Sequence, residues 1–132
     1  MASDWYHKAS DQGHAQARSN LGEMYEKGEG VPQSYISAIT LYRQAAEQGN
    51  SSAQYNLGSM HYSGKGVSKD AVLSYVLFNL AAASGHSEAI KMRTQMLDQL
   101  SGKELSDGQA LSAQWKVGMK LPLRGKAGSI SY

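Results

Sequence analysis

The sequence predicts an all-α protein, a right-handed superhelical solenoid of antiparallel helix pairs with about three repeats and a C-terminal capping helix. Two observations support this fold class. Glycine-centred turns recur every 36 residues, around Gly13, Gly49 and Gly85. Downstream of the turn the period holds again, since Asn-Leu-Gly-Glu-Met at 20–24 matches Asn-Leu-Gly-Ser-Met at 56–60. A fixed period of this length is typical of stacked repeats, in which each unit contacts mainly its neighbours.

The helices follow from apolar spacing and from breaker residues. Between Ser34 and Gln48 apolar positions recur at steps of three and four, which is the helical period. Gly49 is a left-handed cap candidate, and Asn50 or Ser51 can cap the helix that ends at about Ser63. The same reasoning predicts the other helices, at 4–12, 14–27, 70–84, 86 to about 100, and 103–115. The predicted repeats therefore span about 4–33, 34–69 and 70–101, and the repeat domain spans 4–115.

Composition excludes several classes of protein. The 132 residues suffice for one domain, and the net charge of +2 gives no basic field for nucleic acid. The chain has no cysteine, hence no disulfide or thiolate metal site. No apolar run approaches the roughly 20 residues of a membrane span, and the N-terminus does not resemble a signal peptide. We expect a cytoplasmic protein if the chain is complete, and a periplasmic or envelope location if it is a fragment of an exported protein.

Small residues recur at one phase of the period and predict close helix packing. Gly22 and Gly58 both fall inside helices, where glycine costs about 1 kcal/mol relative to alanine. Their recurrence predicts that a neighbouring helix approaches the backbone at these two positions.

These repeated blocks resemble the Sel-1-like repeat family, a relative of the tetratricopeptide repeat. The resemblance covers residues 4 to about 115 and is best in the second unit, where the matching positions are Ala38, Leu41, Tyr42, Ala45, Ala46, Gly49, Ala53, Tyr55, Asn56, Leu57, Gly58 and Met60. The glycine-rich segments Gly28-Glu-Gly-Val-Pro32 and Gly64-Lys-Gly-Val67 are similar to the family's inter-repeat loop. The resemblance implies a bacterial scaffold or adaptor that binds other proteins.

The two ends of the array depart from the family pattern. In the third unit Arg93 and Thr94 stand where leucine and glycine are expected, so we expect this unit to give way to the closing helix. The first helix starts about seven residues short of its counterpart, as in an array cut within a unit. A truncated array and a natural start both remain open. Trp5 and Tyr6, exposed by the short helix, could drive self-association.

No residue pattern indicates chemistry. His14 and His86 follow turn glycines and are expected at helix starts, while His61 takes the phase of Tyr25 and is expected to pack. No metal-ligand spacing occurs, and the glycine-rich loops lack the lysine–serine/threonine ending of a phosphate-binding loop. We therefore predict no catalytic residue, no metal site and no cofactor. Some secreted relatives process β-lactams, but those carry a disulfide in each repeat, which this chain lacks.

The candidate partner site is a groove on the concave side, lined by the first helix of each pair. Its residues combine an aromatic ring, a guanidinium and an amide, which suit an extended peptide. They are His7, Ile39, Arg43, Tyr75 and Asn79. The alternative interpretation is that Ile36, Ile39 and Tyr75 simply pack between repeats.

The segment 116–132 is basic and rich in glycine and serine, and we expect a flexible tail. Its apolar residues, which include Leu121 and Leu123, leave open docking onto a groove of its own or of a neighbouring chain. The function predicted overall is a non-enzymatic scaffold that binds a partner protein or peptide, without nucleic acid and without membrane insertion. The alternatives are a peptidoglycan-associated module of the cell envelope and a β-lactam-processing hydrolase.

Overall fold

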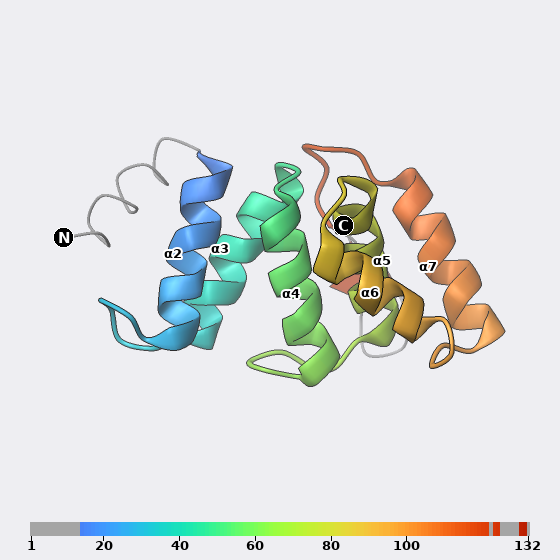
Figure 1. The fold of residues 1–132 in the computed structure, drawn as a ribbon, viewed down its shortest axis with the longest axis horizontal. Helices are drawn as coiled ribbons and strands as arrows, with labels where there is room; N and C mark the ends of the chain where they lie inside the picture. The colour runs from blue at the N-terminus through green and yellow to red at the C-terminus, as the bar shows by residue number, and fades with distance from the viewer. Residues whose placement is uncertain (1–13, 122, 125–129, 132) are drawn as a thin grey trace.

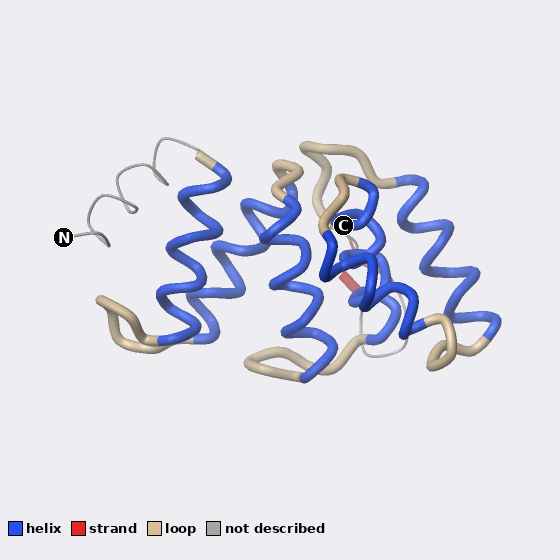
Figure 2. Tube along the Cα trace, in the orientation of Figure 1, coloured by secondary structure: helices blue, strands red, loops and turns tan. Residues whose placement is uncertain are grey.

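The computed structural model describes residues 14–121, 123–124 and 130–131, and in these ranges the chain forms six helices. They are α2 (Ala15–Lys27), α3 (Tyr35–Glu47), α4 (Ser51–Ser63), α5 (Ala71–Ala83), α6 (Ser87–Met96) and α7 (Gly102–Gln114). From α2 to α5 the helices follow one another across the molecule, with α6 in front of α5 and α7 at the far end (Figure 1), and the loops alternate between the two edges (Figure 2). The predicted all-α solenoid of antiparallel helix pairs is confirmed.

The helix bounds lie close to those expected from the sequence, with two exceptions. The expected helix at 4–12 lies outside the described residues. The helix expected to reach about Leu100 ends at Met96, where the amides of Gln99 and Leu100 both bond the Met96 carbonyl in a closing turn. Beyond α7 a short antiparallel ribbon pairs β1 (Leu123–Arg124) with β2 (Ile130–Ser131), Leu123 lying opposite Ser131.

The recurring turn after the first helix of each pair is built from a left-handed glycine and a capping side chain. Gly49 has φ +92° and Gly85 has φ +85°, values that favour glycine because it has no Cβ. The next residue then caps the following helix. Asn50 Oδ1 accepts from the Ala53 amide at 2.8 Å, and His86 Nδ1 accepts from the Ala89 amide at 3.2 Å. The helix-start role expected for His86 is therefore confirmed.

The helical glycines lie where the ring of the following helix rests on the helix backbone. A Cβ added at Gly22 would lie 2.7 Å from Cε1 of Tyr42, and one added at Gly58 would lie 3.0 Å from Cε1 of Phe78. Tyr42 and Phe78 are themselves one period apart, so the same contact joins α2 to α3 and α4 to α5. The predicted approach of a neighbouring helix to these backbones is confirmed.

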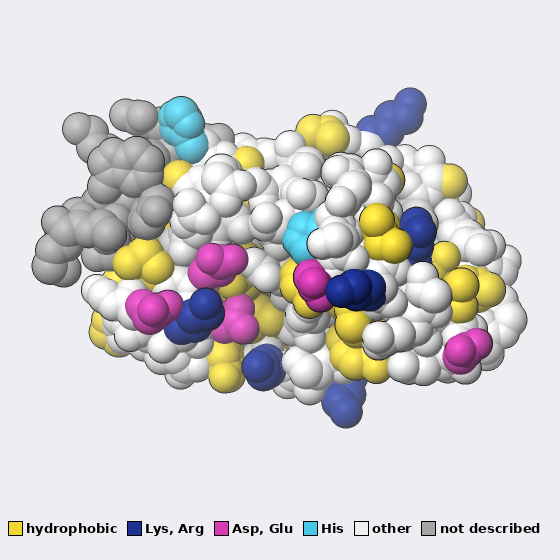
Figure 3. All heavy atoms as spheres, viewed as in Figure 1, with side chains coloured by type: hydrophobic (Ala, Val, Ile, Leu, Met, Phe, Trp, Pro, Cys, Tyr) yellow, Lys and Arg dark blue, Asp and Glu magenta, His cyan; other side chains and the backbone are white. Residues whose placement is uncertain are grey.

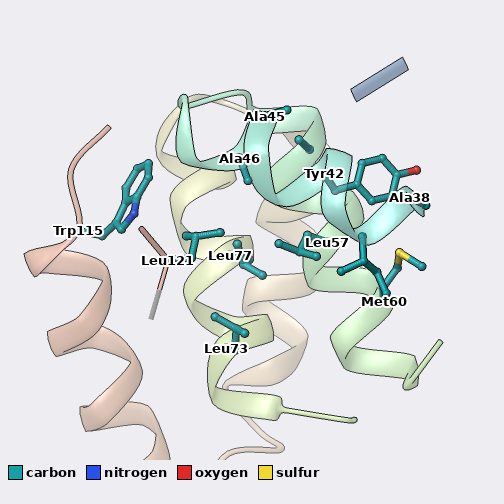
Figure 4. Packing of buried hydrophobic residues seen from close by; sticks show 12 residues of the cluster. Ala38, Tyr42, Ala45, Ala46, Leu57, Met60, Leu73, Leu77, Trp115 and Leu121 are labelled. Carbon is teal, nitrogen blue, oxygen red and sulfur yellow. The ribbon is translucent and has the colours of Figure 1, made fainter. Parts of the chain in front are cut away.

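The largest buried cluster runs from α3 through α4 to α5 and includes two residues from beyond α7. In Figure 4, Trp115 and Leu121 lie next to each other, on the α7 side of Ala46 and Leu77. Leu121 is 2% exposed and Trp115 is 9% exposed. The chain after α7 therefore returns to the centre of the molecule.

The glycine contact predicts the effect of substitution. Gly58→Leu should lower the free energy of unfolding by about 1–3 kcal/mol, because the added side chain meets the Phe78 ring and the helices cannot separate without loss of packing. Chemical denaturation of the purified chain measures this.

The matched control is Gly102→Ala in the first turn of α7, where an added Cβ meets nothing within 4 Å. That variant should be neutral or gain up to about 1 kcal/mol, since alanine restricts the unfolded chain. An unchanged stability for Gly58→Leu would contradict the packing explanation.

Candidate functional site

Helix α7 does not continue the row of pairs but covers one face of α5. A Cβ added at Gly108 would lie 2.7 Å from Cδ2 of Tyr75, so the Tyr75 ring rests directly on the α7 backbone. Leu111, one turn further along α7, forms a buried cluster with Val72 and Val76. This face of α5 is therefore already occupied by a helix of the same chain.

The equivalent face of α3 is open. One period before Val72, Val76 and Leu80, the chain has Ile36, Thr40 and Gln44, which we call the α3 stripe. All three residues are exposed, and Ile36 is 75% exposed, the highest value for any large apolar residue in the described part of the chain. The Thr40 hydroxyl donates to the Ile36 carbonyl at 3.0 Å, so it needs no further acceptor if a partner covers it.

A second feature of this region is the segment Lys116–Leu121, which we call the strap. It joins the end of α7 to the end of α3 through two hydrogen bonds to one residue. The Gly118 amide donates to the Glu47 carbonyl at 2.8 Å, and the Leu121 amide donates to the Glu47 carboxylate at 2.9 Å. The Glu47 carbonyl is one of the free acceptors that every helix leaves at its C-terminus.

The strap is folded into a turn of its own. Gly118 has φ +94°, and the Met119 amide bonds the Lys116 carbonyl at 3.0 Å. The indole Nε1 of Trp115 donates to the Met119 carbonyl at 3.1 Å. The strap is the beginning of the segment that we expected to be a flexible tail, and it is docked on its own chain. The sequence left open whether this segment docks on its own chain or on a neighbouring one.

The structure separates the residues of the groove predicted from the sequence. His7 lies outside the described residues. Ile39 is 7% exposed and Tyr75 is 4% exposed, and the two belong to different buried clusters. Their burial corresponds to the alternative interpretation from the sequence, in which these two side chains pack inside the array. Tyr75 is covered by α7, however, and not by a further repeat.

The two polar members of the predicted groove, Arg43 and Asn79, are both partly buried. Asn79 Oδ1 accepts a hydrogen bond of 3.4 Å from Arg93 of α6. Arg43 is partly buried, and its Nε has no hydrogen-bond partner. Among the described residues, the exposed counterpart of the face that α7 covers on α5 is instead the α3 stripe, one period earlier. The 36-residue register could have found it, since α5 carries apolar residues at all three equivalent positions.

The described part of the chain holds no group of three histidine, cysteine, aspartate or glutamate residues placed to bind a metal ion. No helix in the described ranges is long and apolar enough to cross a membrane. On the face in Figure 3, acidic and basic side chains are mixed rather than gathered by sign, so this face has no large potential of one sign.

Comparison with known proteins places the chain in a family. A family model for the Sel1 repeat matches residues 2–14, 15–50 and 51–86, well over half of the sequence. The chain belongs to the Sel1 repeat family. Its matched units pair α2 with α3 and α4 with α5, the helices joined by the glycine–aromatic contacts. Sel1 repeat proteins are generally non-catalytic modules of protein–protein interaction.

Two solved structures are similar to the Sel1 repeat chain. One is the crystal structure of c5321, described as a protective antigen present in uropathogenic Escherichia coli strains displaying an SLR fold, with 33% identity, a TM-score of 0.82, and coverage of 86% of this chain and 24% of that one. The other is a Sel1 repeat protein from Oxalobacter formigenes, with 35% identity, a TM-score of 0.70, and coverage of 74% and 40%. This chain spans less than half of either protein. No curated protein matches it.

The repeat position shared by Tyr25 and His61 places a titratable ring inside the Sel1 array. His61 is 6% exposed, its Nδ1 donates to the Ser68 carbonyl at 3.4 Å, and its Nε2 is buried without a partner. Burial lowers the pKa of His61 below its usual 6.5, and Arg43 of α3 adds to this, while the Ser68 carbonyl and the charge of Asp70 oppose it. The packing role expected for His61 is confirmed, and the ring is neutral at pH 7.

The lowered pKa predicts a loss of stability in mild acid. Because the unfolded chain binds a proton at His61 more readily than the folded chain does, the free energy of unfolding should fall as the pH drops from 7 to 5.5. His61→Gln should reduce this fall, which denaturation at a series of pH values measures. His14→Gln, at an exposed histidine without a cap hydrogen bond, is the control and should retain the wild-type fall. If the free energy of unfolding falls equally in wild type and in His61→Gln, the assignment of this fall to His61 is wrong.

Proposed function

We propose that this Sel1 repeat chain is a scaffold that binds a helix of a partner protein on the α3 stripe. The observation that carries the proposal is the equivalence of α3 and α5. The positions covered by α7 on α5 are the same positions, one period on, that α3 leaves exposed. Helix α5 accepts α7 at these positions. We infer that α3, one period earlier in the chain, accepts a helix of a partner at the equivalent positions.

The residues of the stripe indicate what kind of segment it would accept. Ile36, at the position of Val72, offers a large apolar side chain that a partner can remove from water. Gln44, at the position of Leu80, offers an amide donor and acceptor that an apolar α5 position lacks. This combination favours a helix with one apolar anchor and one polar side chain close to it. The mixed charges on the face shown in Figure 3 give no support to a nucleic-acid partner.

Other functions have less support. An envelope module that binds cell-wall material and a β-lactam-processing hydrolase were the alternatives from the sequence. No arrangement among the described residues favours either of them, and neither is proposed.

The proposal predicts where a partner will be found. A photo-crosslinking amino acid at Thr40, introduced in the cell that makes the protein, should give a crosslinked partner peptide that mass spectrometry can identify. The same crosslinker at Gln99, which is exposed after α6, should not give that peptide. Equal yields of the same peptide from both positions would remove the stripe from consideration.

With that partner purified, Ile36→Glu should weaken binding at least about ten-fold, since a carboxylate would be buried without a counter-charge. Its own stability should change by no more than about 0.5 kcal/mol, because the side chain is exposed in the free protein. Leu97→Glu is the matched control at the C-cap of α6, where the leucine is 46% exposed, and it should bind normally. Normal binding by Ile36→Glu would overturn the proposal.

A further inference from the structure

The strap is attached to the array by few contacts, and these are of a kind that a separate peptide could make. Only Leu121 among its residues is buried, at 2% exposure. Lys116, Gly118 and Lys120 are exposed, and so are the apolar residues Val117 and Met119, at 67% and 41%. Both hydrogen bonds to Glu47 come from backbone amides, which every non-proline residue carries.

The contacts of α7 are independent of the strap. Gly108 and Leu111 hold this helix against Tyr75, Val72 and Val76 of α5, without using any strap residue. Release of the strap would therefore leave α7 in place. What it would uncover is the strap site, which we define as Glu47, Ala46 and Leu77.

Glu47 is an unusual residue to find at the end of α3. A negative side chain in the last turn of a helix opposes the helix dipole, so it does not stabilise the helix itself. Here its carboxylate and its carbonyl instead form a pair of acceptors, and both are filled by amides of the strap. The pair recognises backbone amides three residues apart, and the apolar cluster beside it holds one leucine.

We propose that the strap site is a second binding site, which takes a turn-forming partner segment with a leucine and which the strap fills in the free protein. The incoming segment supplies two amides to Glu47 and buries its leucine beside Ala46 and Leu77. The strap competes with it as an attached ligand. This inference concerns a surface distinct from the α3 stripe, so each can fail without the other.

The experiment uses the full chain and a defined probe, a fluorescein-labelled peptide of residues 116–124 of this sequence. Two variants release the strap in different ways. Leu121→Ala removes its buried anchor. Gly118→Pro removes one amide donor at a φ of +94° that proline cannot adopt, and it leaves the core untouched. Either variant should bind the peptide at least ten-fold more tightly than wild type, as measured by fluorescence anisotropy.

Two further variants fix the site of that binding. Glu47→Ala, added to Gly118→Pro, should abolish the gain, whereas Glu47→Gln should retain part of it because an amide oxygen still accepts a hydrogen bond. Lys120→Ala, at an exposed strap residue, should behave as wild type. Trp115 emission in a Trp5→Phe background reports release, because its indole is bonded to the Met119 carbonyl. If Trp115 emission shows that the strap is released in Gly118→Pro but the affinity for the peptide does not rise, the strap site does not bind a separate segment and the proposal is overturned.

Discussion

The contact between a glycine of one helix and an aromatic ring of the next holds the array together. Gly22 receives the ring of Tyr42, and Gly58 receives the ring of Phe78. Any other residue at the glycine would place a Cβ inside the ring's van der Waals surface, so the residue type sets the helix separation. Because this separation repeats, the turns, caps and buried alanines that depend on it can repeat with the same period. The Tyr42 hydroxyl also donates a hydrogen bond of 2.7 Å to the Glu26 carboxylate. Burial is the main cause that raises the pKa of Tyr42, and the bond to Glu26 raises it further, so the hydroxyl keeps its proton.

The same contact explains where the array stops and what replaces it. At the position of the third glycine stands Thr94, and beside it Arg93 replaces the leucine, so α6 cannot receive another ring in the same way. Arg93 is used instead in a hydrogen bond to Asn79 within its own unit. The glycine reappears as Gly108 on α7, which receives Tyr75 from a different face of α5. One kind of contact thus serves both to extend the solenoid and to turn its last helix onto a neighbouring face.

Much of the fold could be predicted from the sequence, because helix periodicity, glycine turns and the 36-residue register are local or repeated signals. The site could not be predicted in the same way. The helical spacing of Ile39 and Tyr75 predicts that both side chains lie on an open surface. Each is buried instead by a segment that comes later in the chain. Ile39 lies 3.1 Å from a Cβ placed on Gly66, and Tyr75 lies under Gly108. The contact of Tyr75 leaves no periodic mark, since it joins a helix of the repeats to α7, which lies after them.

The strap shows the same limit for a single residue. In the sequence Leu121 is one apolar residue in a basic, glycine-rich segment, and nothing near it indicates a partner 74 positions away. Glu47 gives an indirect signal, because a carboxylate in the last turn of a helix has no local benefit. In a repeat array, an acidic residue in the last turn of a helix is therefore informative. Its charge is unfavourable to the helix dipole, which points to a favourable contact with another segment. Here that contact is made by the chain itself, through the Gly118 and Leu121 amides of the strap.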